Sequence, residues 1–173
     1  VMAGMYAVYH GKDGLQYIAN RVHSATATLS ESLSSLGFEQ TNTAFFDTIV
    51  IKADTEALQT AAVANSINFN YIDKNTVSIS VNETVSLKEI NAIIHCFTEA
   101  FHLKNIHVSE FSSATMIEEA TQRNSTFLDN DIFNTYQSET DMMRYIKKLE
   151  RKDLALNHSM ISLGSCTMKL NAA

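Results

Sequence analysis

A long helical repeat of apolar residues limits the folds that this chain can adopt. Between Lys12 and Leu36, apolar side chains recur three and four residues apart, which places them along one side of an α-helix. The repeat ends at Gly37, and glycine readily takes the left-handed conformation that closes a helix. Because a helix with one apolar side needs a second layer to cover it, we expect this helix to pack against other elements.

The residues after this helix predict a small sheet. Residues 44–52 are rich in aromatic and β-branched side chains and predict a strand, and residues 68–72 predict a shorter one. Residues 73–75, Asp-Lys-Asn, are typical of a turn. From Thr76 to Val81, apolar and hydroxyl side chains alternate strictly, as in a strand with one buried face and one wet face.

Two shorter helices complete the pattern. Asp54 or Thr55 can cap the first, and Ser86 with Glu89 forms a capping box for the second. Residues 12–107 therefore predict the order α-β-α-β-β-α. The expected fold class is α/β, with a small domain of helices packed on one sheet.

The next residues lack any such period. The segment up to Gln137 is rich in Ser, Thr, Asn and Asp, and predicts an extended connector with a short helix near residues 115–120. Ser138 is predicted to cap a terminal helix that runs from Glu139 to about Lys152. The expected parts are a domain at 1–110, a connector at 111–137, and a helix and loop at 138–173.

Composition excludes several classes of partner. A net charge of −6 argues against nucleic acid and anionic membranes, and the basic residues around Lys147-Lys148 predict one solvated helix face. The chain has no apolar run long enough to span a membrane. With two cysteines 70 residues apart and six histidines that lack metal-ligand spacing, we expect a reducing compartment and no metal site. Cys96 lies on an apolar helix stripe and predicts a packed thiol.

The candidate site lies in the last residues. Gly164 is followed by Ser165, Cys166, Thr167 and Lys169, a run of small donors beside a flexible glycine that can bind an anion. These four residues are the candidate cofactor-binding residues. The alternative is a structural turn with a solvated lysine. Since the chain breaks off here and its first residues predict a helix without a cap, we expect a piece of a larger enzyme.

Several motifs recur together in one known family. They are Met5-Tyr6-Ala7-Val8-Tyr9-His10-Gly11, Phe45-Phe46-Asp47-Thr48, Phe133-Asn134, Ser138-Glu139-Thr140, Met143-Arg144-Tyr145, Leu149-Glu150, Lys152-Asp153-Leu154, and Leu163-Gly164-Ser165-Cys166-Thr167-Met168-Lys169-Leu170-Asn171. In this order they resemble the glycine decarboxylases, the P-proteins of the glycine cleavage system, along essentially the whole chain. Departures from the family pattern occur at Asn130-Asp131, Gln137 and Ser162, where the family often has His-Pro, histidine and proline.

The resemblance implies both a fold and a chemistry. Family subunits consist of two related halves, each similar to a fold-type-I pyridoxal-phosphate enzyme. Residues 1–110 resemble the small C-terminal domain of the first half, and residues from 138 resemble the start of the second. The family decarboxylates glycine with pyridoxal phosphate as electron sink. It then passes the aminomethyl group to the lipoyl arm of the H-protein.

The resemblance also implies what this piece does not do alone. The family's cofactor-binding lysine lies in a His-Lys-Thr-type motif that this sequence lacks, and Lys169 does not correspond to it. We therefore expect no catalytic residue, no bound pyridoxal phosphate and no activity in the isolated chain. The implied partners are the H-protein, the rest of the parent chain and further copies. The implied location is the bacterial cytoplasm or the mitochondrial matrix. The alternative function is a stand-alone α/β module that binds a small molecule or dimerises.

Overall fold

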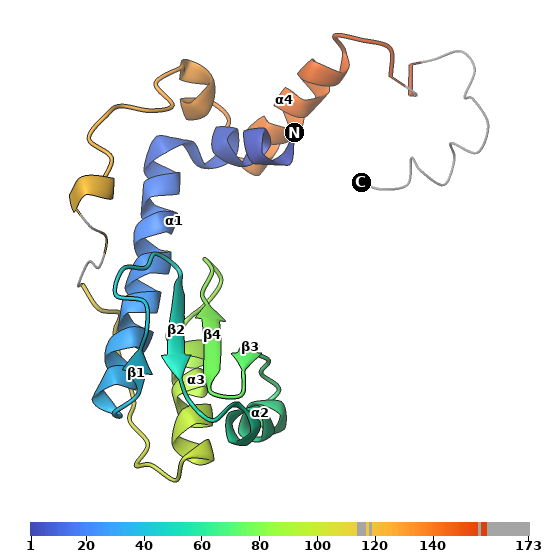
Figure 1. Cartoon of the computed structure of the whole chain (residues 1–173). Helices are drawn as coiled ribbons and strands as arrows, with labels where there is room; N and C mark the ends of the chain where they lie inside the picture. Colours follow the sequence, from blue (N-terminus) through green and yellow to red (C-terminus); the bar gives the residue numbers. More distant parts are fainter. Residues whose placement is uncertain (114–116, 118, 156, 159–173) are drawn as a thin grey trace. The chain divides into compact units, whose positions relative to one another are not determined.

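The computed structural model describes residues 1–113, 117, 119–155 and 157–158 (Figure 1). Its elements in chain order are α1 (Met2–Ser35), β1 (Glu39–Gln40), β2 (Thr48–Lys52), α2 (Thr55–Ala64), β3 (Asn70–Asp73), β4 (Thr76–Ser80), α3 (Leu87–Ala100), the short 3-10 helices η1 (Glu119–Thr121) and η2 (Asp131–Asn134), and α4 (Glu139–Glu150). The chain divides into two compact units, residues 16–125 and residues 1–15 with 126–173. The mixed helices and small sheet confirm the α/β class.

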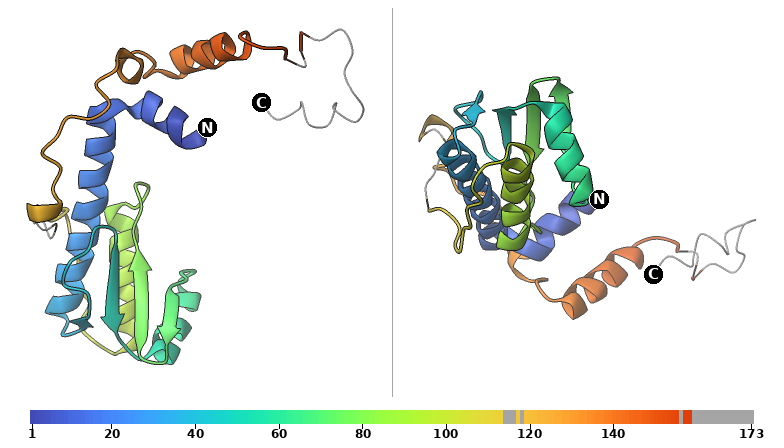
Figure 2. Two further views of the ribbon diagram at one scale, coloured as in Figure 1. Left: turned by 45° about the horizontal axis from the view of Figure 1, so that its top comes forward. Right: turned by 90° about the horizontal axis from the view of Figure 1, so that it is seen from below.

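The larger unit is a four-stranded antiparallel sheet covered by helices (Figure 2). The strand order is β1-β2-β4-β3, and β2 pairs with β4 from Thr48 opposite Ser80 to Lys52 opposite Thr76. The predicted buried face of β4 is confirmed, because Val77 and Ile79 are buried, but Ser78, on the face expected to be wet, is buried as well. On the same face as Ser78, the hydroxyls of Thr48 and Ser80 lie 2.8 Å apart.

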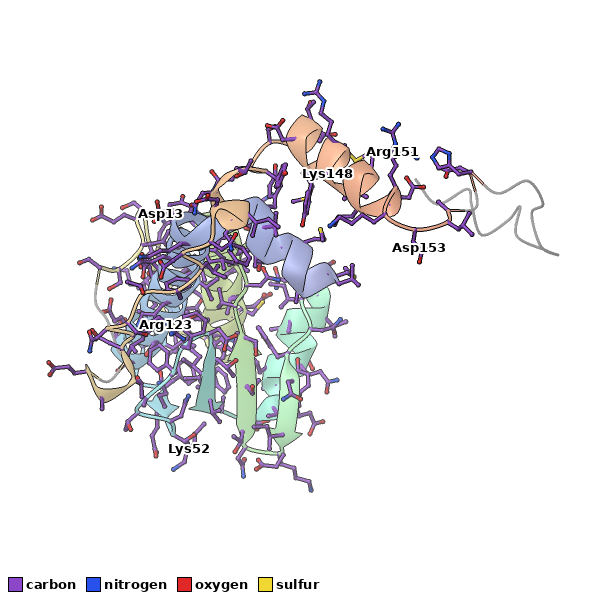
Figure 3. The ribbon with its side chains drawn as sticks, turned by 90° about the horizontal axis from the view of Figure 1, so that it is seen from above. Asp13, Lys52, Arg123, Lys148, Arg151 and Asp153 are labelled. Carbon is purple, nitrogen blue, oxygen red and sulfur yellow. The ribbon has the colours of Figure 1, made fainter. Side chains whose placement is uncertain are left out.

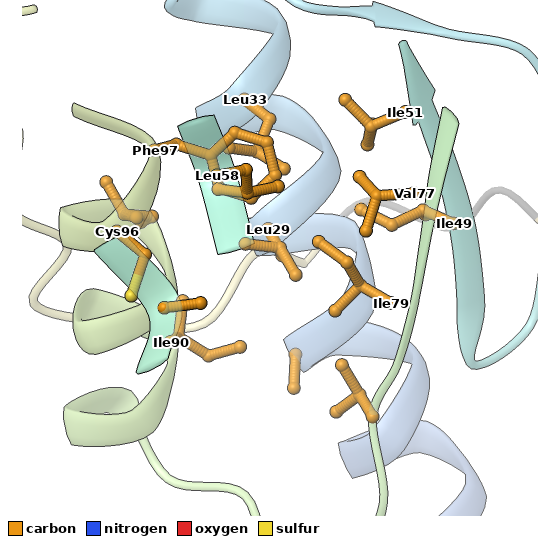
Figure 4. Packing of buried hydrophobic residues seen from close by; sticks show 14 of the residues in the cluster. Leu29, Leu33, Ile49, Ile51, Leu58, Val77, Ile79, Ile90, Cys96 and Phe97 are labelled. Atoms are coloured by element: carbon orange, nitrogen blue, oxygen red, sulfur yellow. The ribbon is translucent and has the colours of Figure 1, made fainter. Parts of the chain in front are cut away.

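The core of this unit lies between the sheet and helices α1, α2 and α3. Its largest fully buried side chains come from all three helices and from both central strands (Figure 4): Leu29, Leu33, Ile49, Ile51, Leu58, Val77, Ile90, Ile94 and Phe97. Since side chains of this kind contribute about 1.5–3 kcal/mol each on burial, this core is the main source of stability in the unit.

Local signals set the ends of the helices as predicted. The Asp54 carboxylate accepts hydrogen bonds from the first turn of α2, and Ser86 and Glu89 form both halves of the capping box on α3. Gly37 has φ of +92°, and the Phe38 N–H donates to the Leu33 carbonyl at 3.1 Å, which closes α1.

The two helices expected at the start of the chain, one in the first residues and one from Lys12, are both present, because α1 (Met2–Ser35) is interrupted by the non-helical backbone of Gly11. One strand boundary was wrong. The strand expected from Ala44 begins at Thr48, since Phe45 packs into the core from a loop. The strand β1 was not predicted. Of the short helix expected at 115–120, residues 115, 116 and 118 lie outside the described residues, and η1 covers 119–121.

The smaller unit has its own cluster of side chains. Val8 of α1 packs with Met142 and Tyr145 of α4, and the ring of Tyr136 stacks on Tyr145 with centroids 4.2 Å apart. Ser138 caps α4 as predicted, because its hydroxyl accepts a hydrogen bond from the Asp141 N–H at 3.1 Å. Lys12 lies over the ring of Phe127, 5.7 Å from its centroid.

Candidate functional site

The predicted cofactor-binding residues cannot be placed. Ser165, Cys166, Thr167 and Lys169 lie outside the described residues. The last described residue is His158, whose backbone N–H donates to the Ala155 carbonyl at 2.9 Å. The candidate loop therefore remains a prediction.

The larger described pocket lies beside the second half of α1. It has a volume of about 580 Å³ and is bounded on the other side by residues 106–113. Two hydrogen bonds hold it together: the Ser112 N–H donates to the Thr28 hydroxyl at 2.7 Å, and the Ser112 hydroxyl donates to the Glu31 carboxylate at 3.0 Å. Sequence patterns missed this arrangement.

The same pocket does not suit a phosphate. Its lining includes two carboxylates, Glu31 and Glu110, and the remaining lining residues carry hydroxyl or apolar side chains. Pyridoxal phosphate needs cations or backbone N–H groups around its phosphate, so negative side chains would repel it. The larger described pocket therefore does not fit the phosphate of the cofactor. The smaller described pocket, about 250 Å³ between β3, β4 and Ile93, is lined by amide, hydroxyl and apolar side chains.

Side chains from distant parts of the chain position the segment that follows α3. The Asn91 amide donates to the Val108 carbonyl at 2.9 Å and accepts from the Val108 N–H at 2.9 Å. The Arg21 guanidinium donates to the carbonyls of Glu83 and Val85 at 3.3 and 3.2 Å and lies 5.5 Å from the ring centroid of Phe111. The start of the predicted connector is therefore held against the larger unit by specific contacts.

Cys96 is a core residue, as predicted. Its side chain is fully buried on α3, and burial, aided by the charge of Glu99, raises the pKa of the thiol. Since the thiolate is the reactive form of cysteine, a raised pKa makes the Cys96 thiol a poor nucleophile.

Burial also raises the pKa of Tyr71, whose hydroxyl lacks a hydrogen-bond partner among the described residues.

Two of the histidines, His10 and His95, belong to no catalytic group among the described residues. His10 packs against the rings of Tyr6 and Tyr9, with centroids 4.3 and 5.2 Å apart. His95 lies 3.8 Å from Glu99 on the exposed side of α3. Within the part of the chain that the structure describes, no three His, Cys, Asp or Glu side chains come together as a metal site. No described helix combines the length and apolar character that a membrane crossing requires.

Comparison with known protein families shows which family this chain belongs to. The family model for the glycine cleavage system P-protein matches residues 1–97. The chain belongs to the glycine cleavage system P-protein family. This confirms the resemblance seen in the motifs.

Individual P-proteins match along the entire chain. The glycine dehydrogenase (decarboxylating) of Flavobacterium johnsoniae is 58% identical over 173 residues, and that of Christiangramia forsetii is 56% identical over 173. Both matches cover 100% of this chain. The protein of the same name from Bacteroides fragilis is 43% identical over 176 residues, which covers 99% of this chain. The chain spans 18% of the length of each of these relatives.

Proposed function

We propose that this chain is an internal part of a glycine dehydrogenase (decarboxylating). The observation that supports this most strongly is the 58% identity that extends over all 173 residues while covering 18% of the relative. The whole protein would decarboxylate glycine with pyridoxal phosphate and transfer the aminomethyl group to the lipoyl arm of the H-protein. The relatives named above are bacterial, which favours the cytoplasm over the mitochondrial matrix for this protein.

Within that protein, the chain would join the two halves. Residues 1–110 would form the small C-terminal domain of the first half, residues 111–137 the connector, and residues 138–173 the start of the second half. Ser165, Cys166, Thr167 and Lys169 would contact the cofactor or the substrate carboxylate. The full-length protein would also form homo-oligomers.

The isolated chain would be inactive. Support comes from the charge of its larger pocket, which is lined by Glu31 and Glu110, and from the missing His-Lys-Thr-type motif. The test is to supply the purified 173-residue chain and the full-length protein with pyridoxal phosphate, glycine and lipoylated H-protein. Carbon dioxide release and an imine absorbance band are expected from the full-length protein only. Either signal from the isolated chain would contradict the proposal.

The role of the loop needs a separate experiment. In the full-length protein, Lys169→Gln and Thr167→Ala should weaken the affinity for pyridoxal phosphate or raise the KM for glycine. Lys148→Gln, a change of the same type on α4, is the matched control and should leave both unchanged. Wild-type affinity and KM in the two loop variants would remove these residues from the site. The stand-alone module has less support, because the chain matches one continuous stretch of longer proteins.

A further inference from the structure

The smaller described pocket lies where β4 extends beyond its neighbour β3. The two strands pair as far as Asn70 opposite Ser78, whereas β4 continues to Ser80 and pairs there with β2 alone (Figure 1). The pocket has a volume of about 250 Å³ and lies between residues 67–70, the end of β4, and Ile93 of α3. We call it the edge notch.

The strand register leaves two backbone groups of Ser80 unpaired at the edge notch. The Val81 N–H donates to the Asp47 carbonyl at 2.9 Å, so in this register the odd-numbered residues direct their backbone groups to β2. The N–H and C=O of Ser80 therefore point to the other side, beyond the start of β3. Neither group has a hydrogen-bond partner in the part of the chain that the structure describes. Ser80 thus presents one donor and one acceptor along the same strand edge.

A buried hydroxyl also lies at the edge notch without a partner. Ser78 is 9% exposed, and its side chain forms no hydrogen bond with any described residue. The hydroxyl of Ser80 differs, because it lies 2.8 Å from the hydroxyl of Thr48. Leaving a buried hydroxyl unpaired is unfavourable. A ligand that hydrogen-bonds the Ser78 side chain would therefore gain affinity.

The lining of the edge notch selects a neutral ligand. It consists of two carboxamides, two hydroxyls and four apolar side chains, without a charged group among these described residues. Lys52, labelled in Figure 3, lies opposite Thr76 at the other end of β4 from Ser80. A free amino acid carries an ammonium and a carboxylate, which would lose water here without gaining partners of opposite charge. An amino-acid residue whose two ends are blocked as amides keeps an N–H and a C=O and carries no charge.

We propose that the edge notch binds a small neutral ligand with the chemistry of one extended peptide residue. The ligand accepts a hydrogen bond from the Ser80 N–H, donates one to the Ser80 C=O, and hydrogen-bonds the Ser78 hydroxyl. Its apolar part packs against Phe69 and Ile93. Pairing of this kind at a strand edge is how sheets recognise extended peptides. Because the notch is smaller than the roughly 300–1,000 Å³ of common ligand pockets, we expect it to hold a single residue.

An NMR titration of the isotope-labelled 173-residue chain tests this site. The probe is N-acetyl-L-leucinamide, which should cause saturable shifts at the amides of Phe69, Ser78 and Ser80. Free leucine, with the same side chain but two charges, is the matched control and should not shift them. N-acetyl-N-methyl-L-leucinamide lacks the N–H that pairs with the Ser80 C=O, and should bind about three- to tenfold more weakly.

A pair of variants tests the buried hydroxyl. Ser78→Ala should weaken the affinity for the probe about three- to tenfold. Thr76→Val, which removes a hydroxyl from the same face of β4 outside the notch, should leave it unchanged. The proposal is overturned by equal shifts with free leucine, by equal binding of the N-methylated probe, or by wild-type affinity in Ser78→Ala. It is also overturned if these amides shift when the chain is concentrated without probe, because a second copy would then fill the notch.

The full-length protein provides a second test. The probe should slow amide hydrogen exchange in the peptide that covers residues 67–80, and no slowing there would contradict the proposal. This readout does not involve glycine decarboxylation, so the two proposals can fail separately. A full-length protein that binds the probe but does not decarboxylate glycine would refute the proposed function alone.

Discussion

Gly11 interrupts α1 with a backbone conformation that side chains do not tolerate. Its φ of +63° and ψ of −172° lie in a region that is essentially restricted to glycine. The space is also closed, since a Cβ at this position would collide with the Phe133 carbonyl oxygen and lie 2.6 Å from the Gln137 amide nitrogen. The absence of a side chain therefore allows residues 133–137 to approach the helix.

Gly11→Ala should destabilise the smaller unit by about 2 kcal/mol or more, because it combines backbone strain with the loss of this close approach. The measurement is amide hydrogen exchange of α4, whose protection should fall. Gly4→Ala is the matched control, because its Cβ would meet nothing within 4 Å inside the same helix. The control should be neutral or slightly stabilising. Equal effects of the two substitutions would show that the conformation at Gly11 is not required.

At the scale of elements, the side chain of Asn42 forms hydrogen bonds with the backbone of β2 beyond the end of β1. β1 pairs with β2 over two residues, Glu39 opposite Lys52 and Gln40 opposite Ile51. Beyond it, the Asn42 side chain accepts from the Val50 N–H at 2.8 Å and donates to the Thr48 carbonyl at 2.9 Å. These bonds use backbone groups that would otherwise lie open along the edge of the sheet.

Asn42→Ala should cost about 1–2 kcal/mol, since two backbone groups lose their partners. It should also increase self-association, because an open strand edge can pair with another chain. Urea denaturation measures the first effect and light scattering over time the second. Asn70→Ala, at the exposed start of β3, removes the same side chain where no side-chain hydrogen bond is described, and should change neither. Unchanged association of Asn42→Ala would show that this edge is protected by other means.

The cap of α3 makes stability depend on pH. Hydrogen bonds from the Ser86 side chain and the Ser86 backbone N–H lower the pKa of Glu89 below its ordinary value. The carboxylate therefore stabilises the folded state above the unfolded glutamate pKa of about 4.3. This stabilisation is lost as the pH falls through the lower folded value.

Glu89→Gln should accordingly flatten the decrease in the free energy of unfolding below pH 5, because the amide keeps an acceptor but does not titrate. Urea denaturation at several pH values provides the measurement. Ser86→Ala should have a similar effect on the slope, since it removes the largest cause of the lowered pKa. Wild-type slopes in both variants would mean that the cap is not coupled to protonation.

Elements that depend on neighbouring residues could be predicted from the sequence, and those that depend on distant residues could not. Asp54, Ser86 and Gly37 act within a few residues, and the structure confirms each cap. β1 forms only because β2 lies beside it. Residues 106–113 have no period of their own. Their position depends on contacts with Arg21 of α1 and Asn91 of α3, which are distant in the sequence. The candidate loop was predicted from its chemistry, and it lies outside the described residues.

At the scale of the whole molecule, the two compact units have cores of very different size. Sixteen buried side chains form the described cluster of the larger unit, and three form that of the smaller one. Hydrophobic burial is the main term that offsets conformational entropy on folding. The smaller unit therefore depends on contacts beyond its own cluster to a greater degree than the larger one.

We therefore expect the two units to unfold separately in the 173-residue chain. Amides of α4 should exchange faster than those of β2, β4 and α3, and the first transition in urea should remove α4 without loss of the sheet. A polypeptide of residues 16–125 should fold alone and keep the second transition, because its cluster is complete within those residues. One cooperative transition with equal protection throughout would contradict this. In that case the units would stabilise each other, and the connector would act as a structural part of one domain.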